Sequence, residues 1–231
     1  LSDNAQIPWT SIVDKQKRVT RKTAWLTLSP CTCSYKYGNV TVAPTPMTEW
    51  FIKFTERTLG VQSHNAHFPN CANLNLYEDG SQVVGWHADD ELLFGGKYTD
   101  CQIISVTLGS ARTFEVALCA GRRDGKLIPK RNTKKTVTLS QGDICVMDGM
   151  FQKHYIHRIP KANKGETGPR INITYRHIIE HETNCPVKQV TKQGVSSTLG
   201  ATPKSEKVTA KVSQEGKEKT KTKESPRETA N

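Results

Sequence analysis

The chain has no long hydrophobic segment, and its 35% hydrophobic content corresponds to a mean hydropathy of -0.58. No apolar run approaches the roughly 20 residues that a membrane-spanning helix needs, so we expect no membrane segment. The first residues, Leu1–Asn4, also lack the apolar core of a secretory signal peptide, which argues against secretion. Because the first residue is Leu rather than Met, the sequence fits a fragment or a processed product.

The cysteines show no pairing pattern. There are seven, an odd number, and they lack the C-x-x-C spacing that is typical of many zinc sites. Cys101, Cys119 and Cys145 lie in apolar runs, where free cysteine behaves as a small hydrophobic residue. We therefore predict reduced core thiols rather than a disulfide framework. Reduced thiols favour a nuclear or cytosolic location.

Acidic residues are too few to balance the basic ones. The formal net charge is +11 and the pI is about 9.4. From Glu182 onward there are ten Lys/Arg and six Glu, a net of +4, which leaves +7 for residues 1–181. The part that we expect to fold is therefore itself basic. Such a balance favours polyanionic partners, nucleic acid above all.

The C-terminal segment has almost no apolar periodicity. From about residue 184 to 231 it lacks aromatics and is rich in Lys, Glu, Thr and Ser, as in Lys217–Lys223. It cannot bury enough apolar surface to offset the entropy of ordering, so we predict disorder. Two roles remain open: a solvated tail without further function, or an electrostatic arm for nucleic acid.

One amphipathic helix is expected over residues 45–60. Thr45 can cap it, Pro46 suits the first helical position, and Gly60 can end it. Trp50, Phe51 and Phe54 fall on one face, which indicates core packing.

From residue 73 onward, short strand-like runs follow one another without intervening helices. Gly, Asp, Asn and Pro clusters separate them, and Gly121–Lys126 reads as a polar turn. This pattern predicts a mostly β fold, a jelly roll or a related double-sheet barrel. The eight predicted strands lie near residues 73–77, 82–89, 101–109, 113–119, 135–140, 143–147, 154–159 and 170–178.

A possible metal site begins at His87 and Asp89. Alternate residues of a strand point to the same face, so both side chains can meet one ion. His157 is the candidate third ligand, and His154 is a rival that would lie on the opposite strand face. Two His and one carboxylate, with positions left open, are typical of non-haem Fe(II) oxygenases. An isolated H-x-D is weak evidence, because a core histidine explains it equally well.

The remaining histidines have no helpful sequence neighbours, and we predict packing or surface roles for them: His64, His67, His177 and His181.

A second chemical signal lies in Arg170–Arg176, where polar and apolar residues alternate strictly. The polar face could belong to an edge strand in water, or it could line an anion pocket. The two arginine backbones are separated by roughly 20 Å, at about 3.3 Å per residue. They could reach in from opposite ends and bind the two carboxylates of a dicarboxylate such as 2-oxoglutarate, since guanidinium binds carboxylate in a bidentate fork.

In their order along the chain, these residues resemble the AlkB-like Fe(II)/2-oxoglutarate dioxygenases. The resemblance covers about residues 15–180 and is densest in 70–180. Three further segments are also similar to that family: Ile103–Phe114, Gly142-Asp143 and His157–Pro160. The motifs that carry it are Asn75-x-Tyr77, His87-x-Asp89-Asp90-Glu91, His157 and Arg170-x-Asn172-x-Thr174-x-Arg176.

The resemblance implies a double-stranded β-helix (jelly-roll) core with an N-terminal helix and a nucleotide-recognition lid. It implies three regions: residues 1–69 with the helix and lid, a dioxygenase core over 70–181, and a disordered basic tail over 182–231. It also implies Fe(II), 2-oxoglutarate and O2 as cofactors, with Fe(II) held by His87, Asp89 and His157.

The same resemblance assigns the binding pockets. Arg170 and Tyr77 would hold the distal carboxylate of 2-oxoglutarate, Asn75 and Arg176 the keto-acid end, with support from Asn172 and Thr174. Asp90 and Glu91 would read the polar edge of a flipped base, and Tyr37, in a lid strand Tyr35–Gly38, would stack on it. Arg18–Trp25 is similar to a basic N-terminal segment of the family.

We therefore predict a monomeric enzyme that oxidatively demethylates N-alkylated bases in DNA or RNA and releases formaldehyde, succinate and CO2. Two alternatives remain. One is the same iron chemistry on a protein or small-molecule substrate. The other is a non-catalytic, basic RNA-binding module, against which the complete triad and both arginines argue.

Overall fold

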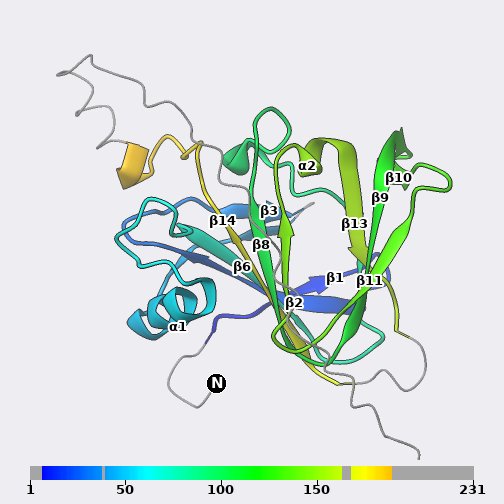
Figure 1. Cartoon of the computed structure of the whole chain (residues 1–231), viewed down its shortest axis with the longest axis horizontal. Coiled ribbons are helices and arrows are strands. Elements are labelled where there is room, and N and C mark those ends of the chain that lie inside the picture. The colour runs from blue at the N-terminus through cyan, green and yellow to red at the C-terminus, as the bar shows by residue number, and fades with distance from the viewer. Residues whose placement is uncertain (1–6, 38–39, 163–167, 189–231) are drawn as a thin grey trace, which may run out of the picture. The chain divides into compact units, whose positions relative to one another are not determined.

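Two mainly antiparallel β-sheets form the framework of the chain in the computed structural model (Figure 1). The structure describes residues 7–37, 40–162 and 168–188, all within one unit that spans Leu1–Ser196. The larger sheet has the order β1 (Thr10–Val13), β2 (Val19–Thr27), β6 (Cys71–Tyr77), β14 (Arg170–Arg176), β8 (Ile103–Gly109) and β12 (Ile144–Met147), with β5 (Thr45–Pro46) parallel to β2.

The smaller sheet has the order β10 (Lys126–Pro129), β9 (Arg112–Arg123), β13 (Tyr155–Ile159) and β7 (Val84–His87), and β11 (Lys135–Leu139) also pairs with β9. A separate two-stranded sheet joins β3 (Tyr35–Tyr37) to β4 (Val40–Val42). The labelled helical elements are α1 (Glu49–Leu59), the 3-10 turn η1 (Leu92–Phe94) and α2 (Phe151–His154), and residues 186–188 are helical as well.

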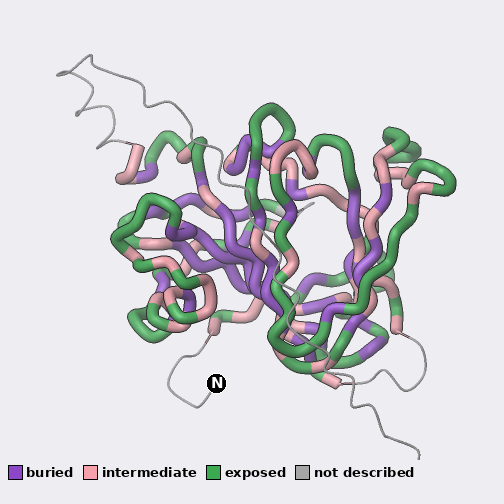
Figure 2. The backbone as a smooth tube through the Cα atoms, in the orientation of Figure 1, coloured by how far each residue is buried: buried purple, intermediate pink, exposed green. Residues whose placement is uncertain are grey.

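From β6 onward the chain crosses repeatedly between the two sheets. Strands β6, β8, β12 and β14 belong to the larger sheet, while β7, β9 and β13 belong to the smaller one. This alternation of successive strands between facing sheets is the jelly-roll arrangement, so the predicted fold class is confirmed. Buried residues concentrate along the strands, and the loop tips are exposed (Figure 2).

Strand β14 lies inside the larger sheet, between β6 and β8. Asn172 pairs with Asn75 on one side and with Thr107 on the other. The alternative of an edge strand with a solvated polar face is therefore wrong. Arg170 and Arg176, at the two ends of the strand, are 1% and 3% exposed. Their charges are thus held inside the fold.

Helix α1 begins later than its sequence suggests. Thr45 and Pro46 form β5, because the backbone N–H of Met47 donates to the carbonyl of Thr27. Thr48 is the N-cap, and its hydroxyl accepts from the N–H of Phe51 at 3.2 Å. Gly60 ends the helix with a φ of 68°, as predicted.

The predicted apolar stripe of α1 is only partly in the core. Phe51 is buried and its ring centroid lies 6.0 Å from that of Tyr175 in β14. Trp50 is 47% exposed and stacks on Phe54 instead. The helix therefore covers the larger sheet mainly through Phe51, on the face opposite to the inward polar residues of β14.

All eight predicted strands exist, but the segment Gly121–Lys126 is not simply a turn. Strand β9 continues to Arg123 and β10 begins at Lys126, so only Asp124 and Gly125 connect them. Both residues have positive φ, 49° and 73°, which is typical of a two-residue Asp-Gly hairpin turn. A rigid hairpin thus carries the basic residues of this region.

The two predicted boundaries, after residues 69 and 181, do not separate structurally distinct regions. Within the region 1–69, strands β1, β2 and β5 extend the larger sheet of the core. In the segment predicted to be disordered, Cys185 is 1% exposed and packs in the core, while residues 189–231 lie outside the described part. No helix among the described residues has the length and apolar character needed to cross a membrane.

Candidate metal and anion site

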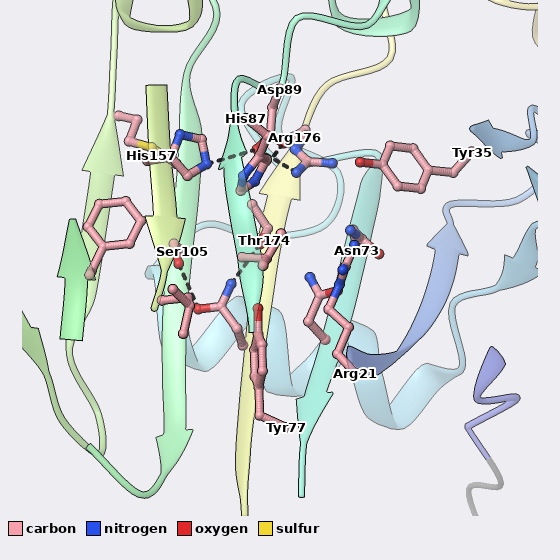
Figure 3. A pocket seen from close by; sticks show the side chains of 16 residues that line it. Arg21, Tyr35, Asn73, Tyr77, His87, Asp89, Ser105, His157, Thr174 and Arg176 are labelled. Carbon is pink, nitrogen blue, oxygen red and sulfur yellow. Dashed lines mark hydrogen bonds and ion pairs between the residues drawn. The ribbon is translucent and has the colours of Figure 1, made fainter. Parts of the chain in front are cut away.

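Three predicted ligands meet between the two sheets. His87, the last residue of β7, pairs directly with His157 of β13. Asp89 Oδ1 lies 3.8 Å from His87 Nε2, and Asp89 Oδ2 lies 3.9 Å from His157 Nε2. The three donor atoms all lie within 4.8 Å of one another (Figure 3). One metal ion can therefore contact all three.

The route by which Asp89 reaches this point differs from the predicted one. Strand β7 ends at His87, so Asp89 lies beyond it rather than two positions along the same strand. The side-chain amide oxygen of Gln152, in α2, accepts from the N–H of Asp89 at 2.9 Å and fixes the turn. The rival ligand His154 ends α2 and is exposed, which excludes it from the cluster.

The cluster carries the protonation states that a metal requires. Burial lowers the pKa of His87, and burial together with His87 lowers the pKa of His157 to about 3. Burial alone would raise the pKa of Asp89, but Arg176 and the two histidines hold it at about 2. Nδ1 of His87 lies 2.8 Å from the carbonyl oxygen of Gly85, which can only accept, so Nε2 is left with its lone pair. Two neutral imidazoles and a carboxylate result.

Arg176 connects the triad to the rest of the pocket. Its Nη2 donates to Asp89 Oδ2 at 2.6 Å, and its guanidinium lies 4.9 Å from the Phe94 ring centroid and 5.6 Å from that of Tyr35. Its Nε and Nη1 are buried without a partner among the described residues. Such unmet donors cost about 1–3 kcal/mol each, and more when charged, so they mark the place of an anion beside the metal ligands.

Arg170, at the other end of β14, is also a buried arginine with unmet hydrogen-bond donors in the described part of the chain. Its Nη2 donates to Thr107 Oγ1 at 3.0 Å and to Asn172 Oδ1 at 2.7 Å, which shows that the side chain leans along the strand. Its guanidinium lies 5.6 Å from the Tyr77 ring centroid. Its Nε and Nη1 are also buried and unpartnered among the described residues. Each of the two guanidinium groups therefore offers unmet donors to an anion.

The polar residues between these ends form one hydrogen-bonded row. Ser105 Oγ donates to Asn172 Oδ1 at 2.9 Å, and Asn172 Nδ2 donates to Thr174 Oγ1 at 2.8 Å. Figure 3 shows Tyr77 at one end of the pocket and Asp89 with Arg176 at the other. Arg170 does not itself line the cavity, but it contacts Asn172 and Tyr77, which do. The other predicted metal and co-substrate residues line the cavity: Asn75, Tyr77, His87, Asp89, His157, Asn172, Thr174 and Arg176.

Arg21 and Tyr35 are among the pocket residues that the sequence did not predict. Arg21 belongs to Arg18–Trp25, which resembles a basic N-terminal segment of the family, but it is 4% exposed and its Nε donates to Asn75 Oδ1 at 2.8 Å. Tyr35 is 2% exposed, stacks on Trp25 and lines the pocket. The period-2 alternation of Arg21, Thr23 and Trp25 in β2 was the available signal, because it places all three on one strand face.

The predicted substrate residues are more scattered. Glu91 Oε1 accepts from the Tyr35 hydroxyl at 2.9 Å, and burial, followed by the charge of Asp89, raises the pKa of Glu91 to about 7. Asp90 lines a different groove, with Trp86, Arg122 and Arg158. Tyr37 ends β3, but its side chain lies outside the described part. Recognition of a base by these three residues stays a prediction.

Fold and site together define a jelly-roll protein with a buried His-Asp-His cluster beside a polar pocket that contains Arg176. Residues 3–176 match the family model described as the 2OG-Fe(II) oxygenase superfamily, and the chain belongs to that family. The predicted AlkB-like type is confirmed by relatives that are AlkB homologues. The chain thus falls in the class of Fe(II)/2-oxoglutarate-dependent dioxygenases, which use Fe(II), 2-oxoglutarate and O2.

Three relatives illustrate the similarity. Mouse "Alpha-ketoglutarate-dependent dioxygenase alkB homolog 3" is 28% identical over 191 residues, 78% of this chain and 60% of that protein. Arabidopsis thaliana "DNA oxidative demethylase ALKBH2" is 33% identical over 123 residues, 48% of this chain and 38% of that protein. "Uncharacterized protein R406" of Acanthamoeba polyphaga mimivirus is 31% identical over 159 residues, 68% and 73% of the two chains. The chain thus spans about 60% of the length of the alkB homolog 3 relative.

Proposed function

We propose that the protein oxidatively demethylates N-alkylated bases in nucleic acid, with Fe(II), 2-oxoglutarate and O2. The observation that carries this proposal is a pair of buried guanidinium groups with donors that are unpartnered among the described residues. That of Arg176 contacts the His-Asp-His cluster, and that of Arg170 lies at the other end of β14. A non-catalytic module has no need to bury two charges without partners, because each such burial is costly. A co-substrate with two carboxylates offsets that cost.

In this proposal His87, Asp89 and His157 hold Fe(II), which supplies O2 activation when bound. Arg176 binds the end of 2-oxoglutarate nearest the metal and keeps Asp89 ionised, since it already contacts that carboxylate. Asn75 supports the same end and is itself held by Arg21.

Arg170 binds the distal carboxylate, and the Tyr77 hydroxyl donates to the same group. Asn172 and Thr174 keep the guanidinium of Arg170 in place, because Asn172 accepts from Arg170 and donates to Thr174. The co-substrate thereby lies along β14 with its length fixed by the two arginines.

Nucleic acid is the substrate class that the surface favours. A groove beside His87 is lined by Trp86 and by three basic residues, Arg122, Lys126 and Arg158. Arg122 and Lys126 project from the rigid β9–β10 hairpin, and both are exposed. Phosphate contacts of this kind supply most sequence-independent affinity. The name of the Arabidopsis relative, a DNA oxidative demethylase, agrees with this choice.

Mass spectrometry of short oligonucleotides that each carry one N-methylated base provides the test. With Fe(II), 2-oxoglutarate and O2 we expect loss of one methyl group, together with formaldehyde and succinate. The control is the His157→Ala variant, which removes one ligand and should leave the oligonucleotide unchanged. Succinate formation with a peptide, but with no methylated oligonucleotide, would instead support the protein-substrate alternative.

A further inference from the structure

A second group of potential metal ligands lies outside the pocket described above. Cys31 and Cys33 follow β2, while His181 and Cys185 belong to the segment after β14. Their donor atoms all lie within 4.8 Å of one another. The three cysteines are nearly inaccessible, with exposed fractions of 7%, 0% and 1%. Two segments that are about 150 residues apart in the chain therefore meet here.

We propose that Cys31, Cys33, His181 and Cys185 bind one Zn²⁺ in a closed, tetrahedral, structural site. Cys₃His is a common ligand set for structural zinc. It would give these cysteines a role beyond core packing, and His181, for which the sequence suggested only a packing or surface role, lies beside three of them. The proposal is independent of the proposed function, because none of these residues lines the dicarboxylate pocket.

The distances match a tetrahedron around zinc. With Zn–S bonds of about 2.3 Å and a Zn–N bond of about 2.0–2.1 Å, ligand atoms should be separated by about 3.8 Å for S···S and about 3.6 Å for S···N. The Sγ atoms of Cys31 and Cys185 are 3.8 Å apart. His181 Nδ1 lies 3.6 Å from the sulfur of Cys31 and 3.4 Å from those of Cys33 and Cys185.

Hydrogen bonding alone does not explain why three sulfurs surround one ring nitrogen. Nδ1 of an imidazole has a single N–H or a single lone pair, so it can serve one sulfur well, not three. A disulfide does not explain it either, because an S–S bond is about 2.05 Å long and leaves the third cysteine and His181 without a role. A shared cation satisfies all four groups at once.

One backbone donor also reaches the sulfurs. The N–H of Glu182 donates to Cys33 Sγ at 3.3 Å. Three thiolates on one Zn²⁺ carry a net negative charge, which such a donor helps to offset.

The proposed zinc site would fix part of the neighbouring pocket. Tyr35 is two residues beyond Cys33, and Arg176 is five residues before His181. The Arg176 guanidinium lies 5.6 Å from the ring centroid of Tyr35. A cross-link between these two segments would hold Tyr35 of β3 against the end of β14. It would also explain why residues 182–188, predicted to be disordered, belong to the folded part.

Metal analysis of the full-length chain tests the site. The His87→Ala variant is used as the parent, so that zinc in the His-Asp-His cluster does not confuse the count. We expect one zinc per chain in the parent and its loss in a further Cys185→Ser variant. Cys145→Ser is the matched control, since Cys145 lies in β12 away from the cluster, and it should keep its zinc.

Replacement of zinc by Co²⁺ identifies the ligands without reference to activity. We expect a sulfur-to-cobalt charge-transfer band in the near ultraviolet and intense visible bands of tetrahedral Co²⁺. Both should vanish in Cys185→Ser, while His181→Cys should retain cobalt with shifted visible bands. If Cys185→Ser does not fold, chelation of the parent still decides the matter: the melting temperature should fall and recover on adding Zn²⁺ alone.

Two results would overturn the proposal. One is a parent protein that takes up neither Zn²⁺ nor Co²⁺ with thiolate bands while its thiols are reduced. The other is mass-spectrometric detection of a disulfide among Cys31, Cys33 and Cys185 in metal-replete protein purified under reducing conditions.

Discussion

Arg176 donates from Nη2 to Oδ2 of Asp89 at 2.6 Å, and both side chains are buried. This contact couples the two halves of the site, because the same guanidinium that keeps the metal-binding carboxylate ionised also offers its remaining N–H groups to the co-substrate. Metal and 2-oxoglutarate should therefore bind in a linked manner.

Replacing Arg176 by Met should weaken the binding of both Fe(II) and 2-oxoglutarate. Without the guanidinium, burial would raise the pKa of Asp89 and reduce its charge near neutral pH. Loss of such a supporting contact typically weakens metal binding by roughly 10- to 100-fold. Anaerobic titration with Fe(II), followed by 2-oxoglutarate, measures both affinities. The Arg176→Lys variant keeps the charge, so its affinities for Fe(II) and 2-oxoglutarate should lie between those of the parent and of Arg176→Met. Unchanged Fe(II) affinity in Arg176→Met would contradict the coupling.

Replacing Arg170 by Ala should separate the two affinities. Its guanidinium contacts Thr107 and Asn172 but no ligand of the triad. A hydrogen bond to a charged group contributes about 1.5–3 kcal/mol, so we expect roughly 10- to 100-fold weaker 2-oxoglutarate binding with Fe(II) affinity kept. The visible charge-transfer band of the anaerobic complex reports both steps, and it should be absent in His87→Ala. Equal losses of both affinities in Arg170→Ala would refute the assignment.

The sequence predicted the pocket far better than its surroundings. Strict alternation identifies the inward face of β14 wherever the strand lies, since Arg170, Asn172, Thr174 and Arg176 share one side by geometry alone. Whether that side faces water depends on the neighbouring strands, which the local pattern does not specify. This is why an edge strand remained open until the pairing with β6 and β8 was known.

The errors have the same physical origin. Arg21 reads as a surface charge because its partner, Asn75, is 54 residues away in the chain. Thr45-Pro46 has the composition of a helix start, but a backbone bond from Met47 to Thr27 draws it into the sheet. The cysteine–histidine group has no local spacing motif at all, because its halves meet only when β2 and β14 are in place. Tertiary contacts, not propensities, decide each case.

Glu115 should make the stability of the fold depend measurably on pH. Its carboxylate is 7% exposed as a residue and accepts from Lys134 Nζ at 2.9 Å and from Arg158 Nε at 2.5 Å. Burial raises its pKa, but Arg158 and Lys134 outweigh burial and lower it below the ordinary value. The folded state therefore releases this proton more readily than the unfolded state. The resulting stability is present above the unfolded pKa of about 4.5 and is lost as the pH falls through the folded value.

Thermal unfolding of Glu115→Gln at several pH values checks this sign. At pH 7 we expect a loss of about 1–3 kcal/mol in the free energy of unfolding, because two charge-assisted hydrogen bonds are weakened. The difference from the parent should shrink steadily below about pH 4.5. Glu49→Gln, whose partner Lys53 is an exposed neighbour on α1, serves as the control and should show almost no effect. A difference that grows on acidification would contradict the prediction.

Removal of two charges from the β9–β10 hairpin should weaken nucleic-acid binding specifically. In Arg122→Ser/Lys126→Ser we expect weaker binding of single-stranded oligonucleotides of every sequence, and a salt dependence reduced by about one unit of slope per phosphate contact. Turnover of 2-oxoglutarate without oligonucleotide should not change. Lys53→Ser/Arg57→Ser on α1 removes the same charge from a surface over the other face of the larger sheet. If both double variants weakened oligonucleotide binding equally, the protein's overall positive charge, rather than the hairpin, would account for the binding.

Two truncations should separate the C-terminal segment into an essential and a dispensable part. A chain ending at Lys188 keeps Cys185, which packs in the core, and the Lys188 Nζ bond to the carbonyl of His181. We expect its melting temperature and its turnover of a methylated nucleoside to match those of the whole chain. A chain ending at Glu182 loses Cys185, and burial of a side chain of this kind contributes on the order of 1 kcal/mol or more, so its melting temperature should fall by several degrees. Differential scanning calorimetry of both truncated chains against the whole chain measures the effect. Equal stability of the two truncated chains would show that Cys185–Lys188 contributes nothing to the fold, whereas a large loss on ending at Lys188 would show that residues beyond it are needed.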